Sequence, residues 1–145
     1  MGSFLTRAKR NTAPSIKHPV WTLLMEFDAL DRQKQDDAAR QLTVLWSSFV
    51  EEFGGPRPFM ELPAAEQQAY LGRLDRIREK TEALKGTELG RYYFSVAILR
   101  HFLEALRSND TSTAAIALSK RLVRLTERGR ELQPARNPRL VAAAA

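Results

Sequence analysis

The 145-residue chain contains no cysteine, two histidines, and no apolar run that approaches the roughly 18 residues of a membrane span. The absence of cysteine excludes a disulfide scaffold, a thiolate zinc site and a cysteine nucleophile. Neither histidine belongs to a Glu-x-x-His or His-x-x-x-His pattern, so nothing predicts a metal centre, and His101 is expected to be a bundle histidine with its ring nitrogens satisfied. Glycine-rich phosphate loops and a serine nucleophile elbow are lacking too. We therefore expect a cytoplasmic, non-catalytic protein without a metal or other cofactor.

Strand-like alternation of polar and apolar residues is missing as well, whereas apolar residues recur at three- and four-residue spacing in five segments. This pattern predicts an all-α fold, a compact bundle of five helices, or four if the first two are continuous. The bundle is expected to be one domain over residues 19–133. Residues 1–18 are expected to form a flexible basic arm, and residues 134–145 a short disordered tail.

Proline, glycine and capping residues predict where the helices begin and end. We expect the first helix to begin at Pro19, a second to be capped by Asp36, and a third to begin at Pro63. Gly86 is expected to close the third helix, and Thr87 to cap the fourth.

The apolar residues also predict the core. The fourth helix, which contains residues 92–106, is the most apolar and is expected to be the central element. Phe59 and Met60, in the loop before the third helix, are expected to fold back onto the bundle, and Ile77 and Leu132 to lie on core faces.

The net charge of +6 is concentrated at the two ends of the chain. Four bases and no acid lie in residues 1–19, two bases lie in residues 134–145, and the remainder is neutral. Within that neutral part, residues 20–53 carry a net charge of −4 and residues 113–133 a net charge of +3. These opposite charges predict either packing of the two segments against each other or polar contacts with partners.

The fifth helix carries the clearest candidate binding feature. At about 100° per residue, Arg121, Arg124 and Arg128 fall within about 60° of one another beside the apolar stripe, with Lys120 near the edge. Three guanidinium groups in a row suit phosphate binding, because each offers a planar fork of donors. The alternative is that these arginines pair with Glu127 and Glu131 on the same helix, or with the acidic first helices.

The N-terminal arm is the second candidate, and its basic residues could follow a phosphate backbone; they are Arg7, Lys9, Arg10 and Lys17. The first six residues also match the loose pattern for N-myristoylation, and the acid-free composition is similar to that of a transit peptide. An arm that anchors the protein to a membrane surface therefore stays open as a third hypothesis.

Two resemblances bear on function. Residues 121–132, RLVRLTERGREL, resemble the segment after the wing in MarR-type winged-helix repressors, which would imply a strand over residues 121–126, although no recognition helix or wing hairpin precedes them. In size, helix content and basic ends the chain is similar to the small helical subunits of multi-subunit CRISPR effector complexes. That likeness implies contact with a nucleic-acid backbone and with neighbouring subunits, without base readout.

The leading hypothesis is therefore a non-catalytic small subunit of a nucleoprotein assembly, which holds RNA or DNA through the arm and the α-helical arginine ridge. Its other partners would be protein subunits or copies of itself. The alternative is a protein–protein adaptor or chaperone-like bundle that has no role with nucleic acid.

Overall fold

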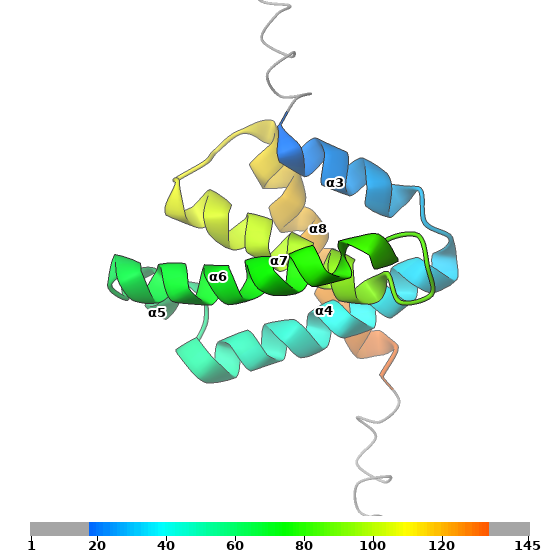
Figure 1. Cartoon of the computed structure of the whole chain (residues 1–145). Coiled ribbons are helices and arrows are strands. Elements are labelled where there is room, and N and C mark those ends of the chain that lie inside the picture. The colour runs from blue at the N-terminus through cyan, green and yellow to red at the C-terminus, as the bar shows by residue number, and fades with distance from the viewer. Residues whose placement is uncertain (1–17, 134–145) are drawn as a thin grey trace, which may run out of the picture.

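The computed structural model describes residues 18–133, and all regular structure in this range is helical (Figure 1). The elements are α3 (Pro19–Asp28), α4 (Arg32–Phe53), α5 (Pro56–Met60), α6 (Ala64–Thr81), the 3-10 helix η1 (Glu82–Leu84), α7 (Arg91–Arg107) and α8 (Thr113–Glu131). The predicted all-α bundle of five helices is confirmed, with the five-residue α5 as an additional short helix. The predicted arm and tail, apart from residue 18, lie outside the described residues.

Two separate helices form the acidic N-terminal part of the bundle. Pro19 occupies the first position of α3, as predicted, and the His18 Nδ1 atom caps the helix by accepting a hydrogen bond from the Val20 amide at 3.2 Å. The cap of α4 is Asp31, whose carboxylate accepts the Lys34 amide at 2.9 Å. The prediction of Asp36 as this cap is wrong, because Asp36 lies one turn inside α4.

The loop after α4 returns an aromatic side chain to the core, as predicted. Gly54 ends α4 with a φ of +91°, in the left-handed region that favours glycine. The turn leads into α5, and Phe59 is fully buried there with its ring centroid 5.4 Å from Phe49, 5.1 Å from Phe53 and 5.8 Å from Tyr70. Edge-on packing of these rings ties α4, α5 and α6 together.

The connection from α6 to α7 differs from the prediction. The α-helix ends at Thr81 and continues as η1, and Gly86 does not adopt the left-handed conformation of a closing glycine. Gly90, rather than Thr87, precedes the first residue of α7, and a Cβ at Gly90 would lie 2.6 Å from the Lys85 carbonyl oxygen. A close approach of the chain to itself therefore determines where α7 begins.

Helix α7 is the central element, as predicted. It packs against each of the other five α-helices, and most of its middle is buried, with Phe94, Val96, Ala97, Ile98 and Leu99 among the buried residues. Helix α6 lies mainly against α7, so only a narrow stripe of it is covered and Ile77 is 41% exposed, contrary to the prediction. Leu132 is also outside the core, because α8 ends at Glu131. None of the helices in the described range is long and apolar enough to cross a membrane.

Candidate interaction site on helix α8

Helix α8 is continuous from Thr113 to Glu131, and it runs behind α6 and α7 in the view of Figure 1. The Ser112 side chain caps it by accepting the Ala115 amide at 3.2 Å. Its buried stripe contains Leu118, Leu122 and Leu125. The strand over residues 121–126 that the resemblance to winged-helix repressors implied is therefore wrong, because a helical apolar pattern runs through the whole segment.

Two of the three predicted ridge arginines are paired with acids of the first two helices. The Arg121 guanidinium donates to both carboxylate oxygens of Asp28, at 2.6 and 3.3 Å. Arg128 donates through Nε and Nη2 to the two oxygens of Asp36, at 3.1 and 3.2 Å. Such two-pronged pairs are the strong form of the arginine–carboxylate contact. The opposite charges of the two segments therefore meet between neighbouring helices at the surface of the bundle.

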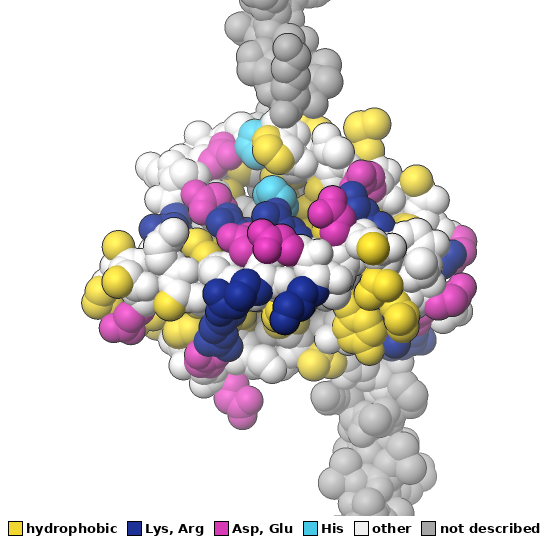
Figure 2. Space-filling view, viewed as in Figure 1, with side chains coloured by type: hydrophobic (Ala, Val, Ile, Leu, Met, Phe, Trp, Pro, Cys, Tyr) yellow, Lys and Arg dark blue, Asp and Glu magenta, His cyan; other side chains and the backbone are white. Residues whose placement is uncertain are grey.

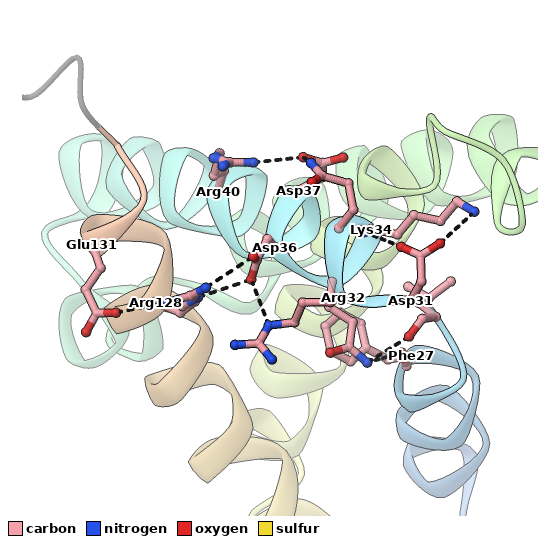
Figure 3. Close-up of polar contacts among 12 residues, drawn as sticks. Phe27, Asp31, Arg32, Lys34, Asp36, Asp37, Arg40, Arg128 and Glu131 are labelled. Carbon is pink, nitrogen blue, oxygen red and sulfur yellow. Dashed lines mark hydrogen bonds and ion pairs between the residues drawn. The ribbon is translucent and has the colours of Figure 1, made fainter.

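Asp36 is the centre of a small charged network, which Figure 3 shows between α4 and α8. Arg128 approaches it from α8, and the Arg32 Nε atom lies 3.8 Å from the same carboxylate within α4. The hydrogen bonds from Arg128 lower the pKa of Asp36 below its ordinary value, against the smaller opposing effect of burial. On its other side Arg128 reaches Glu131 at 3.5 Å, so this arginine has little capacity left for a ligand.

Lys120 and Arg124 differ from these two arginines. Both are exposed, and neither makes a hydrogen bond or an ion pair with another residue in the range 18–133. They border a groove of about 370 Å³ between α3 and α8, to which Arg121 and Asp28 also contribute. Three bases and one acid leave two uncompensated positive charges in this groove.

The floor and walls of this groove are apolar. They include Trp21, Leu24 and Met25 from α3 and Ile116 from α8, and we call the whole feature the α3–α8 groove. Met25 is 70% exposed and Ile116 is 49% exposed, and Val123, next to Arg124 on α8, is 52% exposed. Large exposed apolar side chains that gather in one place are typical of interaction surfaces.

The structure places only half of the predicted site residues. Lys120, Arg121, Arg124 and Arg128 lie on one side of α8, whereas the basic arm residues (Arg7, Lys9, Arg10 and Lys17) lie outside the described residues. Sequence reasoning missed the apolar part of the groove. The sequence did carry a signal for it, because Met25 and Ile116 are apolar residues that lie outside the buried stripes of their helices.

The remainder of the described range offers no metal centre, since no three His, Asp or Glu side chains between residues 18 and 133 are placed to hold a metal ion together. Comparisons with protein-family models, with curated proteins and with solved structures gave no match for this chain. The fold and the site thus define an all-helical bundle that presents one mixed apolar and basic groove.

Proposed function

We propose that this chain is a non-catalytic helical subunit of a larger assembly, and that it binds an acidic amphipathic helix of a partner protein in the α3–α8 groove. The observation that carries the proposal is the combination in one groove of exposed apolar side chains with two uncompensated positive charges. This corresponds to the adaptor hypothesis from the sequence, with a defined surface and a defined partner chemistry.

The shape of the groove suits a helix. Two neighbouring helices, α3 and α8, form its walls, and a third amphipathic helix laid between them would cover Met25 and Ile116. Burial of apolar area contributes about 25 cal/mol per Å², so these side chains would supply much of the binding free energy.

The charges would select the partner. Lys120 and Arg124 lie at the border of the groove, where acidic side chains on the polar flanks of a bound helix could reach them. Charge complementarity of this kind favours acidic partners over basic ones and accelerates association at low salt. A basic or neutral helix would leave both cations without a counter-charge.

A nucleoprotein subunit remains the second candidate, and Trp21 is the observation that favours it. An indole beside Lys120 and Arg124 could stack on a base of a single strand while the cations hold phosphates. The pairing of Arg121 and Arg128 with acids, however, leaves only Arg124 of the predicted ridge, together with Lys120, for phosphate contacts. The affinity for a nucleic-acid backbone depends on the number of phosphates that the protein neutralises. We therefore favour a protein partner over nucleic acid.

The experiment compares two kinds of fluorescent probe on the full chain. One is a panel of acidic amphipathic helical peptides that differ in the spacing of their leucines, and the other is a pair of single-stranded DNA and RNA oligonucleotides. Charge reversal in Lys120→Glu/Arg124→Glu is expected to weaken peptide binding at least about tenfold, equivalent to about 1.4 kcal/mol. The matched control is Arg76→Glu/Lys80→Glu, which reverses the same number of charges at exposed positions of α6 and is expected to leave peptide binding unchanged.

The possible results separate the two candidates. Binding of peptide, lost in the groove variant and kept in the control, would support the adaptor. No peptide binding, or equal losses in both variants, would overturn it. Binding of the oligonucleotides with a steep salt dependence, lost in the groove variant, would instead support the nucleoprotein subunit.

A further inference from the structure

A second hollow, of about 360 Å³, lies away from the α3–α8 groove and contains both histidines of the chain. It is bordered by the start of α3, by α6 and α7, and by the turn after α7. Figure 2 shows the two histidine side chains on one face of the molecule, next to a row of basic and acidic side chains. The titratable residues that line this pocket are His18, Arg78, Arg100, His101, Glu104 and Asp110.

His18 has a structural task that uses both of its ring nitrogens. Its Nδ1 atom accepts the Val20 amide, so the proton of the neutral ring is on Nε2, which donates to the Asp110 carboxylate at 2.9 Å. Asp110 also accepts the Ser112 amide at 2.9 Å. These hydrogen bonds, that from His18 first, lower the pKa of Asp110 to about 2. Neither side chain is therefore free for a ligand.

His101 is in a different situation. Its ring makes no hydrogen bond with any of the described residues, although satisfied ring nitrogens were expected from the sequence, and it lines the pocket. Burial, together with the positive charges of Arg78 and Arg100, lowers its pKa to about 4, against the opposing charge of Asp75. The ring is thus neutral at pH 7, with one donor and one acceptor available beside the two arginines.

The two arginines beside His101 are unequally engaged. All three nitrogens of Arg100 are engaged, because its Nε and Nη2 atoms donate to Asp75 at 2.9 and 3.2 Å and its Nη1 atom donates to Glu104 at 3.1 Å. Arg78 contacts the same Asp75 through one nitrogen, at 3.1 Å, and its other N–H groups have no partner within residues 18–133. Asp75 therefore serves two guanidinium groups, and Arg78 keeps donors for a further acceptor.

We propose that this pocket binds the carboxylate or phosphate group of a small anionic molecule, with Arg78 and His101 as its two donors. A guanidinium with unused N–H groups matches the paired oxygens of either group. The imidazole adds a directional hydrogen bond, and the pocket volume is within the roughly 300–1,000 Å³ typical of small-molecule sites. This site is independent of the groove and of the function proposed for it.

The experiment follows the His101 ring protons by NMR through a pH titration of the full chain. Titrations are compared in sodium phosphate, in sodium citrate, and in sodium chloride at matched ionic strength. An anion bound beside the ring stabilises the imidazolium, so the pKa of His101 is expected to rise from about 4 toward the ordinary histidine value of 6.5 in phosphate or citrate. A rise in phosphate alone would identify a phosphate group as the ligand, and a rise in citrate alone a carboxylate.

Variants test the assigned donor. Arg78→Gln is expected to abolish the rise, whereas Arg76→Gln, at an exposed position of the same helix, is expected to keep it. If Arg78→Gln does not fold by circular dichroism, Arg78→Lys replaces it, and a weakened rise is expected because the planar fork is lost. No rise beyond that in sodium chloride would overturn the proposal, and so would an unchanged rise in the folded Arg78 variant.

Discussion

Four basic residues on the exposed side of α8 form two pairs, which differ in what their charges touch. Arg121 and Arg128, on the edge toward α3 and α4, are each held by the two oxygens of an aspartate. Lys120 and Arg124 lie farther from the buried stripe on the same side of the helix, and they have no such partner in the described range; we call these two positions the open edge and the other two the paired edge. The count of basic residues on a helix is therefore a poor measure of what it offers to a ligand.

The difference between the edges arises from their neighbours. The paired edge faces acids that α3 and α4 bring to it, and a ligand there would have to displace a two-pronged carboxylate. The open edge lies beside the exposed apolar side chains of Met25 and Ile116, which line the groove. This contrast is the reason that we place the interaction site in the α3–α8 groove.

The buried face of α8 holds the helix, and therefore both edges, against the bundle. Its disruption is expected to lower the stability of the protein more than any change at the edges. Gly129 lies where α8 crosses α4, and a Cβ there would overlap the Thr43 hydroxyl and the Ala39 carbonyl. Gly129→Ala is expected to lower the free energy of unfolding by about 1–3 kcal/mol, measured by urea denaturation, although alanine is the better helix former. Gly86→Ala is the control, because a Cβ at Gly86 meets nothing within 4 Å. A Gly129→Ala variant as stable as the parent chain would contradict the close approach of α8 to α4 at this position.

The paired edge is expected to respond to acid, with a smaller effect. Because Asp36 has a lowered pKa, its contribution to stability is present above the unfolded value near 3.8 and is lost as pH falls through the lower folded value. Asp36→Asn should therefore be less stable than the parent chain at pH 7, and the two should converge in strong acid. The urea midpoints of the two chains, measured at pH 7 and in strong acid, check this prediction. A difference between the midpoints that stays the same in acid would contradict it.

The same substitution sharpens the comparison of the edges. Replacement of both acids, in Asp28→Asn/Asp36→Asn, removes the charged partner of Arg121 in the groove and leaves Arg128 with Glu131. We expect a few-fold tighter binding of the acidic peptides, measured by fluorescence anisotropy, because the groove loses an acid and gains an uncompensated cation. Unchanged binding would show that the groove acts through its open edge alone.

Replacement of the two charges of the open edge is expected to have the smallest effect on stability. Lys120→Gln/Arg124→Gln removes two exposed charges that make no hydrogen bond or ion pair with a described residue, so the free energy of unfolding should change by less than about 0.5 kcal/mol. The binding of acidic peptides should fall nonetheless, since these charges would select the partner. A large loss of stability would reveal contacts that the structure does not assign to these residues.

Much of the helical architecture could be predicted because it depends on local patterns. The core stripes of α4 and α8, the start of α3 at Pro19 and the burial of Phe59 follow from the spacing of apolar residues and from proline and glycine. The start of α4 could not be decided in this way, because Asp31 and Asp36 are equally good capping residues in isolation. Gln35 lies inside α4 and helps to fix the start of this helix at Asp31. Its side-chain amide donates to the Phe27 and Leu30 carbonyls at the end of α3.

The candidate site was predicted in part. Helical periodicity places Lys120, Arg121 and Arg124 on one side of α8, as a 3.6-residue repeat requires. Which of them would be neutralised depended on aspartates more than ninety residues away along the chain. The groove has the same origin, because Trp21 and Ile116 become neighbours only when α3 packs against α8.

By itself the sequence determined an all-helical protein with a central apolar helix, an arginine-rich fifth helix and no cysteine chemistry. Only the tertiary structure decided that Arg121 and Arg128 are occupied, that Lys120 and Arg124 border an apolar groove, and that His101 opens into a pocket. The physical reason is the range of the forces involved. Periodicity and capping act within a few residues of chain, whereas charge compensation and exposure depend on which distant helices are brought into contact.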